Sequence, residues 1–292
     1  AEIVNEAFDR GVNFFDTGHN YSNFNAEPRL GEIIGELLKR TDRSNVVIST
    51  KGGTTVPRAS VLSRRRGGAK DFTPDAIEAS CVASIENLRC GYLDVFQLHG
   101  PSEGQITDEL LERLSSMRDR GMYRYLGVNT HSEAQLEYVA EHPEVFDLAL
   151  LDYSPLQLDR EAVISKLARS GVGVVAGTVL AQGHLVNRKI GSIRNGSFFF
   201  YTARSLLKPT SRNLAVSSGV MRNVLRSIPE MSAAQAAFSY VLANPGVSSC
   251  VFGTTSLANC IEVIESSELQ LSDNSMSAIR QAFEPMGQNV SV

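Results

Sequence analysis

LDVFQLHGPSEGQITDELLERLSSMRDR, residues 93–120, contains a strand followed by a helix in its simplest form. Leu93–Leu98 is a largely apolar run without strict alternation, which is typical of a parallel strand covered on both faces. Asp108–Arg120 then places apolar residues at helical spacing and predicts an amphipathic helix. A second strand is expected at Tyr125–Asn129, so this part of the chain predicts a βαβ unit.

The same alternation of strand and helix extends to both ends of the chain. Strands are predicted at Val12–Phe15, Val46–Thr50, Leu93–Leu98, Tyr125–Asn129, Leu148–Asp152, Val172–Ala176 and Ser248–Phe252. Helices are predicted at Pro28–Leu38, Pro74–Leu88, Asp108–Arg120, Ser132–Ala140, Arg160–Arg169, Leu257–Ser266 and near Asp273–Phe283. Repeated βα units form either an open doubly wound sheet or a closed barrel.

The start of the sequence favours the barrel. A closed (β/α)8 barrel, or TIM barrel, needs eight strands, one more than the pattern shows. The chain opens with AEIVNEAFDR, which already has the pattern of a helix. We therefore expect an α/β fold, a (β/α)8 barrel whose first strand would lie upstream of Ala1, with a single domain over residues 1–292.

The composition is that of an ordinary globular protein. Of the 292 residues, 42% are hydrophobic and 21% are charged, which provides a large core and excludes global disorder. No apolar run is long enough to span a membrane. The 28 basic and 32 acidic residues give a net charge of −4, so nucleic acid is not expected as the main partner.

Cysteines and histidines form neither a metal pattern nor a redox pattern. The four cysteines have no CxxC or zinc-site spacing and lie in apolar stretches, so buried reduced thiols are expected. They are Cys81, Cys90, Cys250 and Cys260. The five histidines are scattered, and no metal site is expected. Reduced thiols, and a sequence in which no signal peptide is visible, favour a cytoplasmic protein.

Two segments interrupt the regular alternation. Gly52–Asp71 is either a solvated loop, or a lid or anion contact near a functional site. It contains five basic residues, Arg58, Arg64, Arg65, Arg66 and Lys70. Leu185–Met231 is longer than a simple connection needs. We expect a helix near Gly219–Ile228 there, and either core-covering helices or a loop over a bound ligand.

Titratable side chains lie at the carboxyl ends of three successive predicted strands. Asp16 ends the first visible strand, Tyr21 follows five residues later, Lys51 follows VVIST, and His99 follows DVFQL. In a barrel these ends meet at one face, where catalytic groups lie. Taken singly, each residue has a structural explanation as a helix cap, a loop aromatic, a solvated lysine or a core histidine. Their occurrence together favours an active site.

The four residue types form a coherent acid–base set. A phenol is a poor proton donor at neutral pH unless its anion is stabilised. An ammonium group about 4 Å away supplies that stabilisation. Asp16 would keep Lys51 charged despite partial burial, and His99 would orient the same substrate oxygen. The expected result is a general acid for a carbonyl, or a general base for an alcohol, at Tyr21.

Six segments, in order along the chain, resemble the aldo-keto reductases, a family of NAD(P)-dependent barrel enzymes. They are GVNFFDTGHNYS (Gly11–Ser22), EPRLGEIIGELL (Glu27–Leu38), STKGG (Ser49–Gly53), LDVFQLHGP (Leu93–Pro101), GVGVVAGTVLAQGHL (Gly171–Leu185) and VFGTTSLANCIE (Val251–Glu262). The resemblance implies a catalytic tetrad of Asp16, Tyr21, Lys51 and His99, with Tyr21 as proton donor. It also implies hydride transfer from a nicotinamide lying across the barrel mouth. GVNFFDT and GVGVV are similar to the galactose and threo-aldose dehydrogenases of the family.

The same resemblance implies the cofactor contacts. The matching positions are Asn129, Thr130, Thr178, Leu180, Gln182, Gly183, Gly253, Thr254, Thr255, Asn259 and Glu262. Asn129 and Thr130 replace the family's Ser-Asn pair at the carboxamide, and Gly177 replaces the tyrosine that usually stacks on the nicotinamide. Gly253 and Asn259 stand where a basic residue and an arginine usually bind the 2′-phosphate. Binding of the NADP 2′-phosphate is therefore expected to be weaker than is usual in the family, and both NADP and NAD remain candidates.

The sequence predicts an NAD(P)-dependent oxidoreductase that transfers a hydride between a nicotinamide and a carbonyl or alcohol. One alternative is a cofactor-independent lyase, dehydratase or epimerase that uses the same tetrad. Another is a non-catalytic binding subunit, similar to the channel-associated members of the family. The expected partner is a small aldehyde, ketone or sugar-like molecule rather than a nucleic acid or a membrane. The absence of Trp favours a polar substrate over a steroid.

Overall fold

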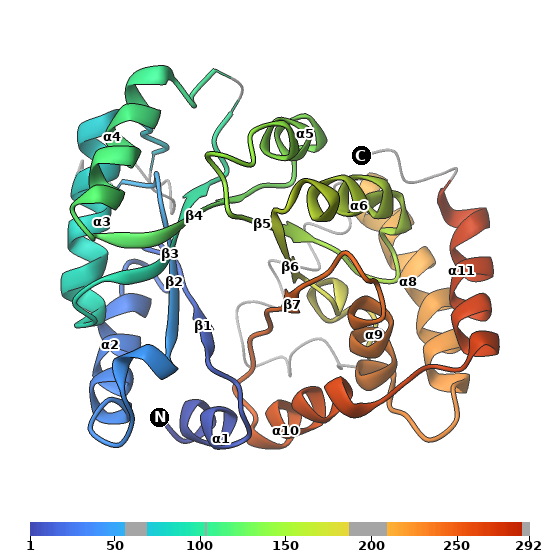
Figure 1. Ribbon diagram of the computed structural model, residues 1–292. Coiled ribbons are helices and arrows are strands. Elements are labelled where there is room, and N and C mark those ends of the chain that lie inside the picture. The colour runs from blue at the N-terminus through green and yellow to red at the C-terminus, as the bar shows by residue number, and fades with distance from the viewer. Residues whose placement is uncertain (56–68, 103, 187–208, 288–292) are drawn as a thin grey trace. The chain divides into compact units, whose positions relative to one another are not determined.

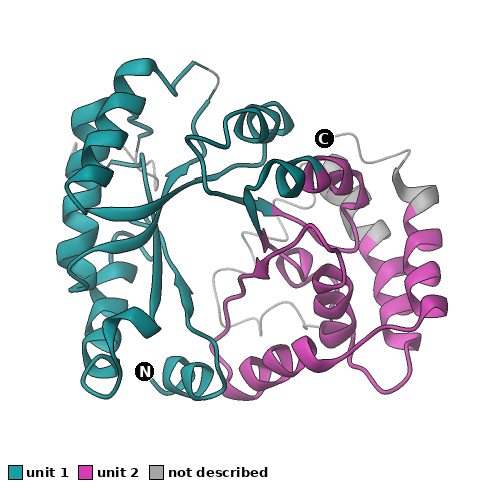
Figure 2. Ribbon diagram, viewed as in Figure 1, with its two compact units in different colours: residues 1–151, 166–174 teal, residues 152–165, 175–292 magenta. Residues whose placement is uncertain are grey.

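The computed structural model describes residues 1–55, 69–102, 104–186 and 209–287, without the side chains of 209–217 and 284–287. These residues divide into two compact units (Figure 2). Unit 1 comprises Ala1–Leu151 and Lys166–Val174, and unit 2 comprises Asp152–Ser165 and Val175–Val292. The expectation of a single domain over residues 1–292 stays a prediction.

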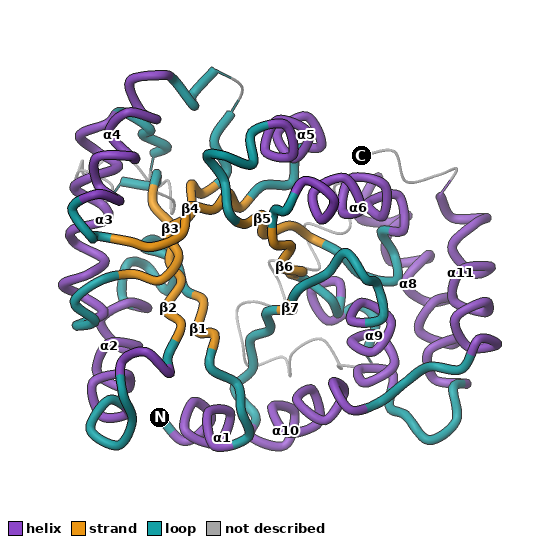
Figure 3. The backbone as a smooth tube through the Cα atoms, in the orientation of Figure 1, coloured by secondary structure: helices purple, strands orange, loops and turns teal. Residues whose placement is uncertain are grey.

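Unit 1 is built on parallel strands whose order in the sheet is their order along the chain (Figures 1 and 3). They are β1 (Phe14–Asp16), β2 (Val47–Gly52), β3 (Leu93–His99), β4 (Tyr123–Asn129) and β5 (Leu148–Asp152). The register places Asp16 opposite Ser49 and Lys51 opposite Gln97. Because neighbouring strands are parallel, their carboxyl ends share one edge of the sheet.

Helices alternate with the strands of unit 1, beginning with one that precedes β1. They are α1 (Glu2–Asp9), α2 (Ala26–Leu37), α3 (Pro74–Leu88), α4 (Asp108–Asp119) and α5 (Glu133–Glu141). In Figure 1, α2, α3 and α4 lie along one side of β2 and β3, with α2 packed on α3 and α3 on α4. The approach of α2 to α3 depends on Gly31, because a Cβ there would lie 2.1 Å from the carbonyl oxygen of Asn87. Pro74 occupies the first turn of α3, where its missing N–H costs nothing.

Unit 2 holds the end of β6 (Gly173–Gly177) and β7 (Ser249–Cys250), which pair in parallel with Val175 opposite Ser249. The remaining helices are α6 (Glu161–Ser170), α8 (Pro209–Ser227), α9 (Ala233–Leu242), α10 (Leu257–Glu265) and α11 (Asp273–Gly287). Within unit 2, α8 packs on α9 and α11, and α10 packs on α9. The division between the units passes through β5, β6 and α6.

All seven predicted strands are present, with ends that differ by no more than two residues from the prediction. The helix expected near Gly219–Ile228 is α8, which begins earlier, at Pro209. α9 was not predicted, because seven of its ten residues are buried and it has no polar face. Parts of the two irregular segments, residues 56–68 with four of the five basic residues and residues 187–208, lie outside the described residues.

The four cysteines are free thiols, as predicted; Cys81, Cys90 and Cys260 are buried, whereas Cys250 is only partly buried, so the prediction of burial is wrong there. Burial raises the pKa of the Cys81 and Cys250 thiols to about 12. The described residues contain no group of three His, Cys, Asp or Glu side chains that could hold a metal ion. None of the helices in the described ranges is both long and apolar enough to cross a membrane.

Candidate active site

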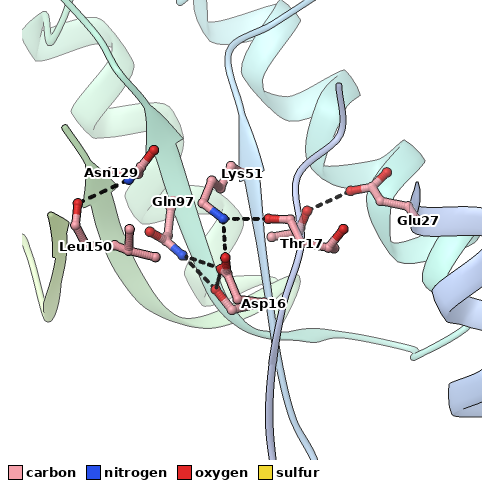
Figure 4. A network of polar contacts seen from close by, with 9 residues as sticks. Asp16, Thr17, Glu27, Lys51, Gln97, Asn129 and Leu150 are labelled. Carbon is pink, nitrogen blue, oxygen red and sulfur yellow. Dashed lines mark hydrogen bonds and ion pairs between the residues drawn. The ribbon is translucent and has the colours of Figure 1, made fainter. Parts of the chain in front are cut away.

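Asp16 and Lys51 form a buried ion pair at the carboxyl ends of β1 and β2 (Figure 4). Lys51 Nζ contacts Asp16 Oδ2 and also donates a hydrogen bond to the carbonyl oxygen of Thr17 at 2.7 Å. The side chain of Lys51 is 1% exposed. A buried ammonium group is costly to remove from water unless it is paired. The carboxylate of Asp16 is therefore the partner that compensates for burial of the Lys51 side chain.

Ser49 and Gln97 hold the carboxylate of Asp16. Ser49 Oγ donates to Asp16 Oδ1 at 2.9 Å, and Gln97 Nε2 donates to the same oxygen at 3.0 Å (Figure 4). The prediction missed both residues. The alternation of side chains along a strand could have indicated them, because side chains two residues apart share one face of the sheet. Ser49 lies two residues before Lys51, and Gln97 two residues before His99.

Tyr21 is the exposed member of the site and lies in the connection between β1 and α2. Its side chain is 40% exposed, so a ligand can reach it. Lys51 Nζ lies 5.0 Å from the centroid of the Tyr21 ring. The ring of His99 packs edge-on against Tyr21, with centroids 5.9 Å apart and an angle of 83° between the planes. The structure thus brings the four predicted catalytic residues together.

The backbone around Tyr21 is strained and tightly fixed. Ser22, Asn23 and Phe24 have φ angles of 50°, 57° and 65°, in the left-handed region that non-glycine residues rarely adopt. The carbonyl oxygen of Tyr21 accepts hydrogen bonds from the N–H groups of residues 25 and 26, both at 3.2 Å. A Cβ at Gly18 would lie 3.1 Å from Tyr21 Cε1. Strain of this kind gathers at functional sites, where it fixes a side chain in place.

His99 is neutral at physiological pH. Burial, together with the positive charges of Lys70 and Lys51 and with His131, lowers the pKa of His99 from 6.5 to about 3. Its buried Nδ1 has no hydrogen-bond partner among the described residues. A neutral imidazole carries one N–H donor and one acceptor nitrogen. His99 is therefore suited to hydrogen-bond a substrate oxygen without carrying charge.

Glu27, another residue that the prediction missed, anchors the Tyr21 connection to β2. Its side chain is 1% exposed. Its carboxylate is bonded by Thr50 Oγ1 and Ser84 Oγ at 2.7 Å each, Asn87 Nδ2 at 3.2 Å and His19 Nδ1 at 3.0 Å. Burial alone would raise the pKa of Glu27, but these hydrogen bonds together lower it. His19 lies two residues before Tyr21 and Thr50 directly precedes Lys51, so the carboxylate joins the two segments that carry them.

Asn129 and Thr130, the predicted carboxamide contacts, lie at the end of β4. Asn129 Nδ2 donates to the carbonyl oxygen of Leu150 at 3.1 Å (Figure 4). The hydroxyl of Thr130 donates to Gln135 Oε1 at 2.6 Å and is therefore engaged in fixing the start of α5. Of this pair, Asn129 is better placed to bind a ligand, because its Oδ1 takes no part in the hydrogen bond to Leu150.

The remaining predicted cofactor contacts belong to unit 2 and follow β6 and β7. They are Thr178, Leu180, Gln182 and Gly183 after β6, and Gly253, Thr254, Thr255, Asn259 and Glu262 after β7. Because β6 and β7 pair in parallel, both groups begin at the same edge of the pair. The backbone is left-handed at Thr178 and Gln182, with φ of 51° and 57°. Ser256 caps α10, whose N-terminus is suited to an anion or a ribose oxygen.

Comparisons with known proteins show which family the chain resembles over its length. The profile of the Aldo/keto reductase family matches residues 1–284. The chain is 26% identical to L-glyceraldehyde 3-phosphate reductase of Escherichia coli over 87% of this chain and 74% of that protein. It is 26% identical to L-galactose dehydrogenase of Arabidopsis thaliana over 97% of this chain and 83% of that protein. It is also 29% identical to a probable voltage-gated potassium channel subunit beta of Arabidopsis thaliana, over 85% and 75% of the two chains.

A solved structure shows the same fold. The holo form of an aldo-keto reductase from Bacillus halodurans superimposes with a TM-score of 0.76 at 21% identity, covering 96% of this chain and 86% of that one. The predicted α/β fold of the (β/α)8 class is thereby confirmed, and the strand expected upstream of Ala1 stays a prediction. From its fold and its family profile, the chain belongs to the aldo-keto reductase family of oxidoreductases.

Proposed function

We propose that this protein transfers a hydride between a nicotinamide cofactor and a carbonyl or alcohol substrate, with Tyr21 as the general acid or base. One observation carries the proposal. The exposed ring of Tyr21 lies 5.0 Å from the buried ammonium of Lys51 and packs edge-on against the neutral ring of His99.

Tyr21 is the group that moves the proton. In the direction of reduction, its hydroxyl donates a proton to the carbonyl oxygen, and the nearby ammonium of Lys51 stabilises the phenolate that remains. Asp16 pairs with that ammonium without competing for the substrate, because its oxygens are bonded to Lys51, Ser49 and Gln97. In the direction of oxidation, the phenolate accepts the proton of the alcohol.

His99 orients the substrate oxygen. With a pKa of about 3, its ring is neutral at physiological pH and donates a hydrogen bond without acting as the acid. This division of roles assigns the proton transfer to Tyr21 alone.

The residues present fit a nicotinamide cofactor, which supplies the hydride when bound. Asn20 Oδ1, Gln97 Oε1 and His99 Nδ1 are buried near the strand ends of unit 1 and have no hydrogen-bond partner within the described ranges. Such atoms favour a polar ligand. Asn129 Oδ1 can accept an N–H of the carboxamide. Gly253 and Asn259 carry no positive charge for a 2′-phosphate, so we propose that the protein does not strongly prefer NADP over NAD.

The proposed substrate is a small polar carbonyl or alcohol. Two of the relatives are named for sugar-like molecules, one for a phosphorylated aldehyde and one for L-galactose. The absence of Trp from the chain agrees with a polar substrate. We also propose that the protein is cytoplasmic, since its four cysteines are free thiols.

Substitution of Tyr21 tests the proposal. Cofactor binding is measured by the fluorescence of NADH and NADPH, and turnover by absorbance at about 340 nm with a panel of aldehydes. Tyr21→Phe is expected to lower kcat by about a thousandfold, since a general acid commonly contributes about that much, while the Kd for cofactor changes little. Tyr125→Phe is the matched control, because Tyr125 is an exposed tyrosine on β4. A wild-type protein with no affinity for either cofactor would contradict the proposal.

A non-catalytic binding subunit is the second candidate function, and the potassium channel relative favours it. It predicts that the wild-type protein reduces no member of the aldehyde panel and purifies with a stoichiometric protein partner. Turnover that depends on Tyr21 excludes it.

A further inference from the structure

Lys70 lies at the edge of the candidate active site and has no part in the chemistry above. It stands near the end of the basic segment Gly52–Asp71 and forms an isolated antiparallel bridge with Thr54. The N–H of Asp71 donates to the carbonyl oxygen of Gly53 at 3.1 Å. These backbone bonds hold Lys70 beside the residues that directly follow Lys51.

The side chain of Lys70 reaches the end of β3. Its Nζ contacts the backbone carbonyl oxygen of His99. A Cβ at Gly100 would lie 3.9 Å from the same Nζ, so the ammonium is next to both residues. Lys70 is also, after burial, the largest cause of the lowered pKa of His99. The ammonium therefore lies next to the residue proposed to orient the substrate oxygen, and burial, the largest cause of the lowered pKa, keeps that ring neutral without Lys70.

No carboxylate balances the charge of Lys70 among the described residues. The other lysines of the described ranges each pair with an acid: Lys39 with Glu36, Lys51 with Asp16, and Lys166 with Glu137 and Glu141. The neighbouring Asp71 accepts hydrogen bonds from Thr73 instead. Partial burial lowers the pKa of Lys70, because it disfavours the charged form of the side chain. An anionic ligand would stabilise that charged form.

Two buried polar atoms beside Lys70 have no hydrogen-bond partner in the described part of the chain. One is Thr54 Oγ1, in a residue that is 5% exposed, and the other is His99 Nδ1. Lys70 and Thr54 supply an ammonium and a hydroxyl, donors whose hydrogen bonds carboxylate and phosphate oxygens accept, while the one N–H of the neutral His99 ring serves the carbonyl oxygen.

We propose that Lys70 is a specificity-determining residue, which selects substrates that carry a carboxylate or a phosphate ester in addition to the carbonyl. The anionic group binds the ammonium of Lys70 while the carbonyl oxygen binds Tyr21 and His99. This inference rests on the proposed function, because it requires a carbonyl at Tyr21.

Matched pairs of aldehydes test the inference. One pair is 4-carboxybenzaldehyde and 4-nitrobenzaldehyde, and the other is glyceraldehyde 3-phosphate and glyceraldehyde. Lys70→Met is expected to lower kcat/KM for the anionic member of each pair by about tenfold, chiefly through KM, and to leave the neutral member unchanged. Added salt is expected to weaken the preference of the wild type for the anion but to have little effect on the variant.

Two controls separate this role from others. Lys39→Met removes a lysine near the end of α2 and is expected to leave both members of each pair unaffected. KM values for NADH and NADPH are measured with Lys70→Met, because the 2′-phosphate of the cofactor is a second source of the same anion chemistry.

Four outcomes would count against the proposal. Equal losses on the anionic and neutral members, or no loss on either, overturn it and leave the proposed function standing. A higher KM for NADPH alone, with unchanged selectivity among the aldehydes, assigns Lys70 to the cofactor and also overturns it. A wild-type protein that is inactive on both members of each pair overturns the proposed function, and the inference with it.

Discussion

The neutral imidazole of His99 has a consequence for the pH dependence of both activity and stability. Because the pKa of His99 is lowered to about 3, we expect titration of His99 to cause no change in kcat/KM between about pH 5 and 8. A change in kcat/KM centred near pH 6.5 that is lost in His99→Gln would contradict the neutral state of the His99 ring. In the unfolded chain the ring regains a pKa of about 6.5, so between about pH 6.5 and 3 the unfolded state binds a proton that the folded state does not.

The contribution of His99 to the free energy of unfolding is therefore fully present above pH 6.5 and declines as the pH falls below it. Urea unfolding at about pH 7.5 and 5 measures this decline. We expect His99→Gln to lose less stability between these two values than the wild type does. An equal loss in both proteins would show that His99 is not held neutral by the fold.

At the scale of elements, the contact of α2 with α3 distinguishes two glycines of the same helix. A Cβ at Gly31 would lie 2.1 Å from the backbone oxygen of Asn87, whereas a Cβ at Gly35 would meet nothing within 4 Å. Gly31→Ala is expected to destabilise the protein by about 2 kcal/mol or more, because backbone atoms must move apart. Gly35→Ala is expected to stabilise it by about 0.5 to 1 kcal/mol, because alanine favours the helix. Chemical unfolding of both variants checks this prediction, and equal effects of the two substitutions would contradict the helix packing.

The strands were easier to predict from the sequence than α9, a helix without distinct polar and apolar faces. The parallel strands are short apolar runs next to turn residues, so their positions follow from local sequence. α9 lacks a polar face, and its only local signal is the capping box formed by Ser232 and Gln235. The candidate residues Asp16, Lys51 and His99 could be grouped from the sequence because they lie at the ends of successive strands. Ser49 and Gln97 required the strand register as well, and Glu27 could not be found because its four partners come from separate parts of the chain.

The folded chain contains side-chain contacts of Thr130 and Lys70 that the sequence did not predict. Thr130 was expected to contact the cofactor, yet its hydroxyl donates to Gln135, and only the folded chain reveals this bond. Lys70 was one of several basic residues in a long loop, and its contact with the carbonyl oxygen of His99 singles it out. Long-range hydrogen bonds of this kind depend on which elements meet, and the periodicity of one segment contains no information on them.

At the scale of the whole molecule, the predicted residues for proton transfer and for cofactor binding fall in different units. Unit 1 carries Asp16, Tyr21, Lys51 and His99, and unit 2 carries most of the predicted cofactor contacts. Cofactor-independent proton transfer by the same tetrad would need only the first of these sets. Hydride transfer also needs a bound nicotinamide, so the origin of the hydrogen in the product separates the two chemistries.

The most direct test follows deuterium from the cofactor to the product. The wild-type protein is incubated with an aldehyde and with NADH or NADPH deuterated at either face of C4, and the product alcohol is analysed by mass spectrometry. We expect one deuterium on the former carbonyl carbon, delivered from one face of the cofactor only, and formed about a thousandfold more slowly by Tyr21→Phe. Conversion of a substrate without deuterium transfer, or turnover by Tyr21→Phe at the wild-type rate, would contradict the proposed hydride transfer.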